Sequence, residues 1–341
     1  MKKLRVLILV DEAFVPRDSI VGLSDKQIAP WKTEFDVKVT LEELGHEVKL
    51  LGVAGELEVV RKDLDDFKPD IVFNMLEEFR GQSVYVPYLL GYLELRRQPY
   101  TGCNPGGMLL NNSKALAKKI LRYHGVPIPD FAVLSRGAPY KRPKRLAFPL
   151  IVKSTTEHGS VGISRTSIVR DDHKLRKRVE YVHDELETDA LVEAYIDGRE
   201  LYVGIMGNDR LKVLPTWELL ITKRPRGTPV IATERVKWDL AYQVKAGVKT
   251  KAAKNLDGRL VRRIARVCRE AYRALGQTGY ARMDLRLSPE GEVYLLESNP
   301  NPQLAYGEDF AESAHAVGVP YDRLIQRIVA LGMESNGVWT G

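Results

Sequence analysis

The residues best suited to chemistry lie on two short apolar runs near the C-terminal end. The first run contains Arg282 and Asp284, the second ends in Glu297-Ser298-Asn299, and residues 288–291 (Ser-Pro-Glu-Gly) separate them. Proline and glycine between two such runs favour a hairpin turn. Because side chains alternate between the faces of a strand, Arg282 shares a face with Asp284, and Glu297 shares one with Asn299. If the two strands pair with these residues opposite, an arginine, two carboxylates and an amide oxygen converge.

Oxygen ligands of this kind suit Mg²⁺, which prefers one or two carboxylates together with waters and substrate phosphates. Two ions bridged by one carboxylate would bind both sides of a transferring phosphoryl group. Arg282 would neutralise the charge that develops there. The alternative is the polar outer face of an exposed hairpin, and the hairpin alone does not decide between the two.

A second polar segment follows the buried apolar run at residues 149–152. Lys153 ends this run, and a loop containing Gly159, Ser160 and Gly162 comes next. Small residues let backbone N–H groups approach phosphates, and a lysine supplies a point charge. The alternative is a flexible surface turn with an ordinary lysine, because the loop is not a Walker A sequence.

A third segment, residues 191–203, joins two predicted strands. An apolar connection between two lobes would expose backbone donors and acceptors to the edge of an adenine ring, and Glu200 is a candidate for the ribose hydroxyls. A plain hairpin is the alternative.

Composition is ordinary for a soluble globular protein, with 44% hydrophobic and 28% charged residues among 341. No apolar run approaches the roughly 20 residues that span a bilayer, so we expect a cytoplasmic location. The net charge of +7 suits an anionic ligand and also nucleic acid. Basic clusters at residues 141–145 and 223–226 favour solvated loops over a nucleic-acid patch, because no aromatic residues are interleaved with them.

The first hundred residues alternate between predicted strands and helices, which favours a parallel sheet covered on both faces. The turn at residues 11–15 lacks G-x-G-x-x-G, so a dinucleotide fingerprint is absent. The predicted strands are 4–10, 47–51 and 70–75, and the predicted helices are 32–44, 55–66 and 84–96.

The rest of the chain mixes helices and strands less regularly. Ser113 is a predicted N-cap for a helix that ends before Gly125. The remaining predicted helices are 113–124, 171–184 and 256–275, and the predicted strands are 150–153, 162–169, 190–195, 201–206, 211–215, 281–287 and 292–298.

Lys114, the glycine loop, the segment at 191–203 and the closing hairpin, taken in this order, resemble the ATP-grasp fold. Within that fold they resemble the D-alanine–D-alanine ligase group, over residues 4–331. The resemblance implies an α/β protein, α+β overall, whose N-terminal parallel α/β lobe precedes two α+β lobes that clamp ATP. The predicted domains are 1–111 for the N-terminal lobe, 112–196 for the small ATP-grasp lobe and 197–341 for the C-terminal lobe.

The resemblance also assigns roles in nucleotide binding. Lys114 and Lys153 would contact the ATP phosphates, beneath a mobile loop formed by Ser160, Val161 and Gly162. Glu193, Tyr195 and Ile196 would line the adenine pocket, and Glu200 would bind the ribose.

The metal site implied by the resemblance holds two Mg²⁺ ions, with Mn²⁺ as an alternative. Asp284 would bind one ion, Asn299 the other and Glu297 both. Arg282 would stabilise the transferred phosphoryl group and the tetrahedral intermediate.

The implied reaction converts a carboxylate into an acyl phosphate, which an amine attacks to form an amide, ADP and phosphate. Because an acyl phosphate also hydrolyses, a lid must exclude water. Residues 222–239 are the predicted lid, and Lys237 matches a phosphate-contacting lysine there. Arg282, Lys237 and Ser160 are therefore the predicted catalytic residues.

The amino-acid pocket departs from the family pattern. A loop serine of the family falls on Gly159, and the lid tyrosine falls on Trp238. The family's histidine–glycine motif is replaced by residues 73–79, and Glu308 follows an altered stretch at 302–305. The predicted substrate residues are Glu12, Trp238 and Glu308. We expect substrates other than two D-alanines, such as amino acids or a short peptide, because sites that hydrogen-bond their ligand reject analogues strongly.

Two alternatives remain open at this stage. One is a true D-alanine–D-alanine ligase of cell-wall synthesis with an altered pocket. The other, from a different class, is a basic nucleic-acid-binding protein without catalysis. The leading interpretation predicts ATP and small molecules as partners, neither nucleic acid nor membrane, and allows a homodimer.

Overall fold

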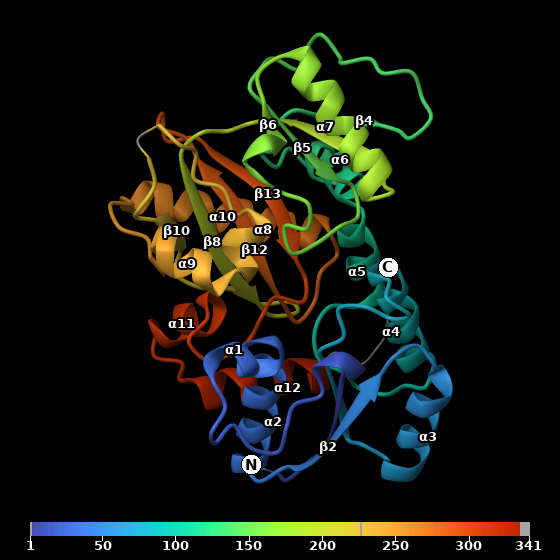
Figure 1. Cartoon of the computed structure of the whole chain (residues 1–341). Coiled ribbons are helices and arrows are strands. Elements are labelled where there is room, and N and C mark those ends of the chain that lie inside the picture. The colour runs from blue at the N-terminus through green and yellow to red at the C-terminus, as the bar shows by residue number, and fades with distance from the viewer. Residues whose placement is uncertain (1, 226, 335–341) are drawn as a thin grey trace.

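The computed structural model describes residues 2–225 and 227–334, and it contains three β-sheets (Figure 1). Arg226, in the second basic cluster, and the last seven residues of the predicted C-terminal domain lie outside the described ranges. None of the helices within those ranges combines the length and apolarity needed to span a membrane.

The N-terminal sheet is parallel, as the sequence predicted, and its strand order is β2-β1-β3. β1 is buried throughout Val6–Val10, which explains its unbroken apolar run. Helices connect the strands and cover the sheet. The elements are β1 (Arg5–Asp11), β2 (Glu47–Val53), β3 (Ile71–Asn74), α1 (Asp25–Ile28), α2 (Lys32–Glu43), α3 (Leu57–Phe67) and α4 (Val86–Leu95).

Two helices lead from this sheet to the small lobe, α5 (Pro105–Asn112) and α6 (Lys114–Tyr123). Ser113 caps α6 as predicted, since its hydroxyl accepts a hydrogen bond from the backbone N–H of Leu116 at 3.3 Å. The cap fixes where α6 begins, and so it places Lys114 on the first turn.

The small lobe is an antiparallel sheet in the order β4-β7-β5-β6, with α7 packed against it. The strand predicted at 162–169 is wrong for most of its length, because Gly162 has a φ of 69° and Arg165–Ser167 form a 3-10 turn. Sequence analysis missed β4. The elements are β4 (Phe131–Leu134), β5 (Leu150–Ser154), β6 (Ile168–Val169), β7 (Ala190–Ala194) and α7 (Asp172–Glu185).

The C-terminal lobe has a larger antiparallel sheet in the order β11-β10-β8-β12-β13, and β9 pairs with β8. The predicted long helix is α10 (Gly258–Ala274), whose apolar side packs on β8, β12 and β13. The strands are β8 (Arg199–Met206), β9 (Lys212–Val213), β10 (Trp217–Ile221), β11 (Val248–Ala252), β12 (Tyr280–Leu287) and β13 (Val293–Asn299), and the short helices are α8 (Glu234–Trp238) and α9 (Leu240–Ala246).

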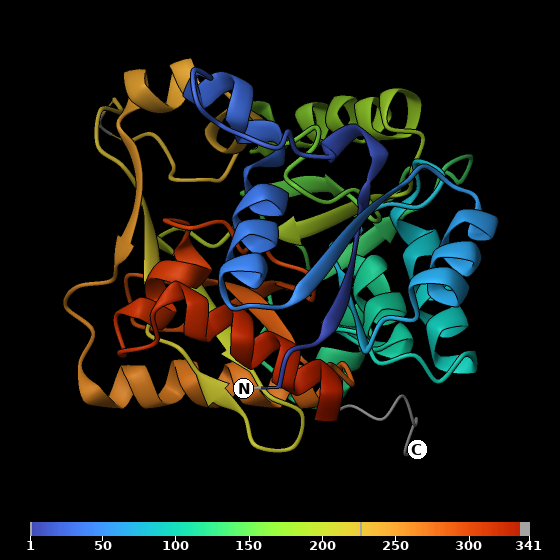
Figure 2. The ribbon, with the colours of Figure 1, turned by 90° about the horizontal axis from the view of Figure 1, so that it is seen from below.

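The chain then returns to the N-terminal sheet through α11 (Asp309–His315) and α12 (Tyr321–Glu334). In Figure 2 these red helices lie beside the blue α2, and α12 contacts both α2 and β3. The two large lobes are therefore joined by a common core, while the small lobe stands above the C-terminal sheet (Figure 1).

Candidate active site

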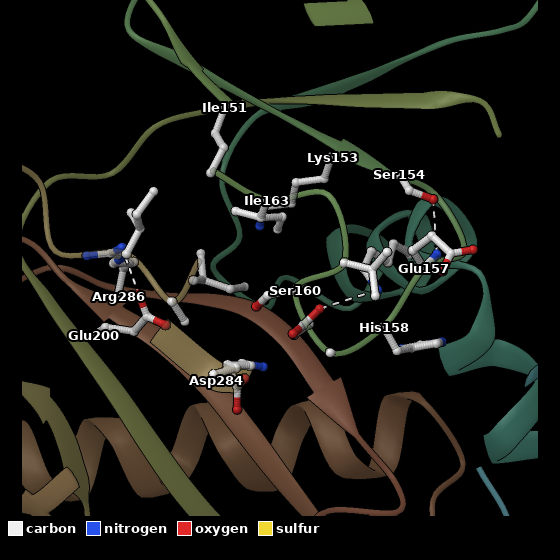
Figure 3. A pocket seen from close by; sticks show the side chains of 18 residues that line it. Ile151, Lys153, Ser154, Glu157, His158, Ser160, Ile163, Glu200, Asp284 and Arg286 are labelled. Atoms are coloured by element: carbon white, nitrogen blue, oxygen red, sulfur yellow. Dashed lines mark hydrogen bonds and ion pairs between the residues drawn. The ribbon is translucent and has the colours of Figure 1, made fainter. Parts of the chain in front are cut away.

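A pocket lies between the sheets of the small and C-terminal lobes (Figure 3). Its lining combines α6, β5 and the glycine loop from one side with β8, β12, β13 and α8 from the other. The predicted site residues that line it are Lys114, Lys153, Ser160, Val161, Glu200, Lys237, Asp284 and Glu297.

The closing hairpin meets the condition set in the sequence analysis, with Asp284 opposite Glu297 and Arg282 opposite Asn299. Arg282 donates to both carboxylate oxygens of Asp284, at 2.8 and 3.0 Å. It also donates to Asp309 at 3.2 Å, so two acidic residues fix the orientation of its guanidinium. Sequence analysis missed Asp309, which reaches the hairpin from the start of α11.

The donor set at this hairpin fits Mg²⁺. Asp284 and Glu297 supply carboxylate oxygens from opposing strands, and Asn299 follows on β13. The Asn299 Nδ2 atom is buried and has no hydrogen-bond partner among the described residues. No hydrogen bond of this nitrogen therefore fixes the orientation of the amide, and a flipped amide would put its oxygen there as a ligand for a cation. Within those residues no group of three or more His, Cys, Asp or Glu side chains could hold a metal ion, and phosphates and waters would complete the coordination.

Lysine charges keep Glu297 ionised. Burial alone would raise the pKa of this carboxyl, but Lys114, Lys237 and Lys153 outweigh burial and hold it well below its usual range. The Lys114 Nζ atom lies 3.4 Å from Glu297 Oε2. The same lysine, together with burial, lowers the pKa of His158 to about 3, so this histidine is neutral near neutral pH.

Glu193 lies beneath the pocket rather than in its lining. Its carboxylate is 1% exposed and bridges two lysines, with Lys118 Nζ at 2.5 Å and Lys153 Nζ at 2.9 Å. Lys118 was not among the predicted site residues, although it follows Lys114 by one helical turn and therefore lies on the same face of α6. Glu193, which is also paired with Lys118, thus holds Lys153 in place. Contact of Glu193 with adenine stays a prediction.

The segment between β7 and β8 contains Tyr195 and Ile196, neither of which lines the pocket. Glu200 does line it, and Figure 3 shows its carboxylate beside Arg286. Their side chains are joined by a hydrogen bond of 2.8 Å, and Tyr202 donates to the other oxygen of Glu200 at 3.0 Å. Arg286 was missed, although strand alternation put it on the same face as Asp284.

Three hydrogen bonds join the glycine loop to α8, which ends the predicted lid, and we call this contact the clasp. Trp238 donates its indole N–H to the Gly159 carbonyl at 2.8 Å. The backbone N–H of Gly162 donates to Glu234 at 2.9 Å, and the Glu234 backbone N–H donates to Ile163 at 3.0 Å. These three bonds place Lys237, on the same short helix, in the pocket lining.

The other two predicted substrate residues, Glu12 and Glu308, are exposed and do not line this pocket. Glu308 instead belongs to a group of neighbouring carboxylates. The charge of Arg282 acts on Glu308 and on Glu77, and Glu77 also interacts with Lys237, Glu34 and Glu78. None of the group has a side-chain hydrogen bond or ion pair within the described ranges. We call this group the acidic wall, and its members are Glu34, Glu77, Glu78 and Glu308.

Comparison with known proteins agrees with this geometry. Residues 120–330 match the family model described as D-ala D-ala ligase C-terminus. The chain is 30% identical to a D-alanine–D-alanine ligase of Oleidesulfovibrio alaskensis, over 90% of this chain and 95% of that protein. It is also 30% identical to an uncharacterized protein, y4sG, of Sinorhizobium fredii, over 88% of each.

Among solved structures, the D-alanine–D-alanine ligase of Bacillus anthracis complexed with ATP superposes with a TM-score of 0.75. The two chains are 22% identical, and the match covers 98% of each. The predicted ATP-grasp fold is thereby confirmed.

Proposed function

The chain belongs to the D-alanine–D-alanine ligase family of ATP-dependent ligases that form a carbon–nitrogen bond, and we propose that its amine substrate is cationic rather than a second D-alanine. The reaction proceeds through an acyl phosphate and releases ADP and phosphate. Mg²⁺, when bound, neutralises the phosphate oxygens during transfer.

The residues of this chain divide the work of such a reaction. Lys114 and Lys153 bind the phosphates from the small-lobe side of the pocket, and Lys237 does so from α8. Arg282, fixed by Asp284 and Asp309, stabilises the charge on the transferred group and on the tetrahedral intermediate. The clasp between the glycine loop and α8 excludes water from the acyl phosphate.

The acidic wall is the observation that carries the choice of substrate. Two of its four carboxylates, Glu77 and Glu308, are close enough to Arg282 to interact with its charge, and the reacting groups must meet near Arg282. The other two, Glu34 and Glu78, interact with Glu77. A substrate carboxylate facing this wall is repelled, whereas an additional ammonium or guanidinium group is attracted. A basic amino acid, a short basic peptide or a diamine therefore suits the amine position better than D-alanine does.

Strict D-alanine–D-alanine ligation is the second candidate, favoured by the name of the Oleidesulfovibrio alaskensis relative. Nucleic-acid binding has less support, because two residues of the first basic cluster make contacts within the small lobe. Arg142 pairs with Asp172 at 2.7 Å, and Arg145 donates to the Phe131 carbonyl at 2.8 Å.

The test supplies the enzyme with ATP, Mg²⁺ and pools of carboxylates and amines, and it follows phosphate release and product mass. We expect turnover with cationic amines and little with D-alanine as both donor and acceptor. Robust turnover with D-alanine alone would overturn the substrate proposal. Glu297→Gln is the matched control, since loss of a carboxylate that would hold Mg²⁺ should abolish turnover with every pair.

A further inference from the structure

Arg286 is a buried arginine in the nucleotide half of the pocket to which the family resemblance assigns no role. It lies on β12 two residues after Asp284 and directly opposite Glu200 of β8. Its side chain is 4% exposed, and the guanidinium lines the pocket together with Glu200 (Figure 3). A charged group buried this deeply requires several partners.

The guanidinium contacts three separate segments of the chain. Its NH2 group donates to Glu200 Oε2 at 2.8 Å and to the Val230 carbonyl at 2.5 Å, and its NH1 group donates to the Gly198 carbonyl at 3.2 Å. Gly198 belongs to the connection from the small lobe, and Val230 precedes the pocket residues Ile231 and Ala232. Only the planar fork of an arginine can serve acceptors in this arrangement.

These contacts leave Glu200 oriented but not saturated. One of its oxygens accepts from Arg286, and the other accepts from the Tyr202 hydroxyl at 3.0 Å. A carboxylate has about four lone-pair positions, so capacity remains for further hydroxyl donors. The ribose of a nucleotide in this pocket supplies two such donors.

We propose that Arg286 is a positioning residue. Its hydrogen bond to Glu200 orients that carboxylate toward the ribose hydroxyls, and its hydrogen bond to the Val230 carbonyl holds this segment next to the nucleotide. The inference rests on the proposed function, because it takes the nucleotide to bind with its ribose at Glu200. It adds a specificity determinant to which the family resemblance assigned no role, although strand alternation places it on the same face as Asp284.

The experiment measures dissociation constants for ATP and for 2′,3′-dideoxy-ATP by calorimetry, without carboxylate or amine substrates. The wild-type protein should prefer ATP, because only ATP offers hydroxyls to Glu200. Arg286→Met should weaken ATP binding about tenfold and remove most of the preference, since hydrogen bonds to charged groups are strong. Arg286→Lys, which keeps the charge but not the fork, should fall between.

The control is Arg199→Met. Arg199 is on β8, next to Glu200, and forms a two-bond pair with Glu218, at 2.9 and 2.6 Å, but it lies outside the pocket lining. Its loss should lower thermal stability and leave the nucleotide preference unchanged.

If Arg286→Met does not fold, the preference for ATP over 2′,3′-dideoxy-ATP is measured on Arg286→Lys instead. Wild-type preference for ATP in a folded Arg286 variant would overturn the proposal, and so would a wild-type protein that binds both nucleotides equally. Absence of ATP binding by the wild-type protein would instead refute the proposed function.

Discussion

Glu34 is the member of the acidic wall whose protonation departs most clearly from that of a free carboxyl. It lies on α2, and burial raises its pKa to about 7, with further contributions from the charges of Glu77, Asp36 and Asp11. Folding therefore takes up a proton at this site between pH 4.5 and about 7. The stability that the protonated Glu34 side chain contributes to the free energy of unfolding is fully present below pH 4.5, and it is lost as the pH rises to about 7.

Glu34→Gln should consequently stabilise the protein in a pH-dependent way. Relative to the wild type, its unfolding free energy should increase across the window from pH 4.5 to about 7. It should then stay higher by roughly 1–2 kcal/mol, a figure reduced for the partial exposure of the side chain. Urea unfolding at a series of pH values measures this difference. The control is Glu43→Gln at the exposed end of the same helix, and an identical pH trend there would contradict the prediction.

At the scale of single residues, local geometry decided what the sequence could reveal. Alternation along two strands was enough to place Asp284 opposite Glu297, because hairpin pairing depends on neighbours in the chain. The same rule would have found Arg286. The contact of Asp309 with Arg282 and the grouping of the acidic wall involve segments that are distant in the chain. Only the complete fold brings these segments together, so no local sequence pattern predicts them.

Among the elements, the clasp between the glycine loop and α8 has the most direct consequence for chemistry. The loop comes from the small lobe and α8 from the C-terminal lobe, so their hydrogen bonds close the pocket between two lobes. The sequence predicted both segments but not their contacts, because Trp238 bonds the carbonyl of a residue that is distant in the chain.

Trp238→Phe should loosen this clasp. It removes the donor to the Gly159 carbonyl and keeps an aromatic ring at a site that is 62% exposed. One hydrogen bond contributes about 0.5–1.5 kcal/mol, so open forms should become roughly two- to tenfold more populated. Water then reaches the acyl phosphate, so the excess of phosphate over amide, which lifts the phosphate-to-amide ratio above one, should grow by a similar factor. Comparison of phosphate and product yields measures this ratio.

Tyr123→Phe, at an 87% exposed position at the end of α6, is the control for that measurement. Its phosphate-to-product ratio should equal that of the wild type. An unchanged ratio in Trp238→Phe would show that the indole bond does not keep the pocket closed.

Some elements were predictable and others were not, for reasons of length and exposure. α10 is long and has one apolar side, so its period is clear. β4 has only four residues, and β11 is an edge strand with exposed lysines. Strands of this kind carry little pattern, and their partners in the sheet determine them.

In the whole molecule, the hydrophobic cores do not follow the order of the chain. One core joins residues of β1 and β3 to Tyr280, Phe310 and α12, while the small lobe has a separate core. The predicted domain bounds at residues 111 and 196 stay a prediction. Sequence periodicity showed which faces were apolar, but not that the N-terminal sheet and the last helices share one core.

Phe310→Ala tests this shared core. The Phe310 ring is 1% exposed, and its centroid lies 5.9 Å from that of Tyr280. Removal should lower the unfolding free energy by about 3–5 kcal/mol. Because the core is shared, amide exchange should accelerate in β1 as well as in β12, while β5 and β7 in the small lobe should change little.

Hydrogen exchange with peptide-level resolution separates these regions, and Phe310→Leu, which retains most of the apolar volume, should give the same pattern with smaller amplitude. Faster exchange confined to α11 would mean that the N-terminal sheet is stable without this contact. Acceleration in both β1 and β12 would instead show that the N-terminal sheet and the closing hairpin unfold together, as a common core requires.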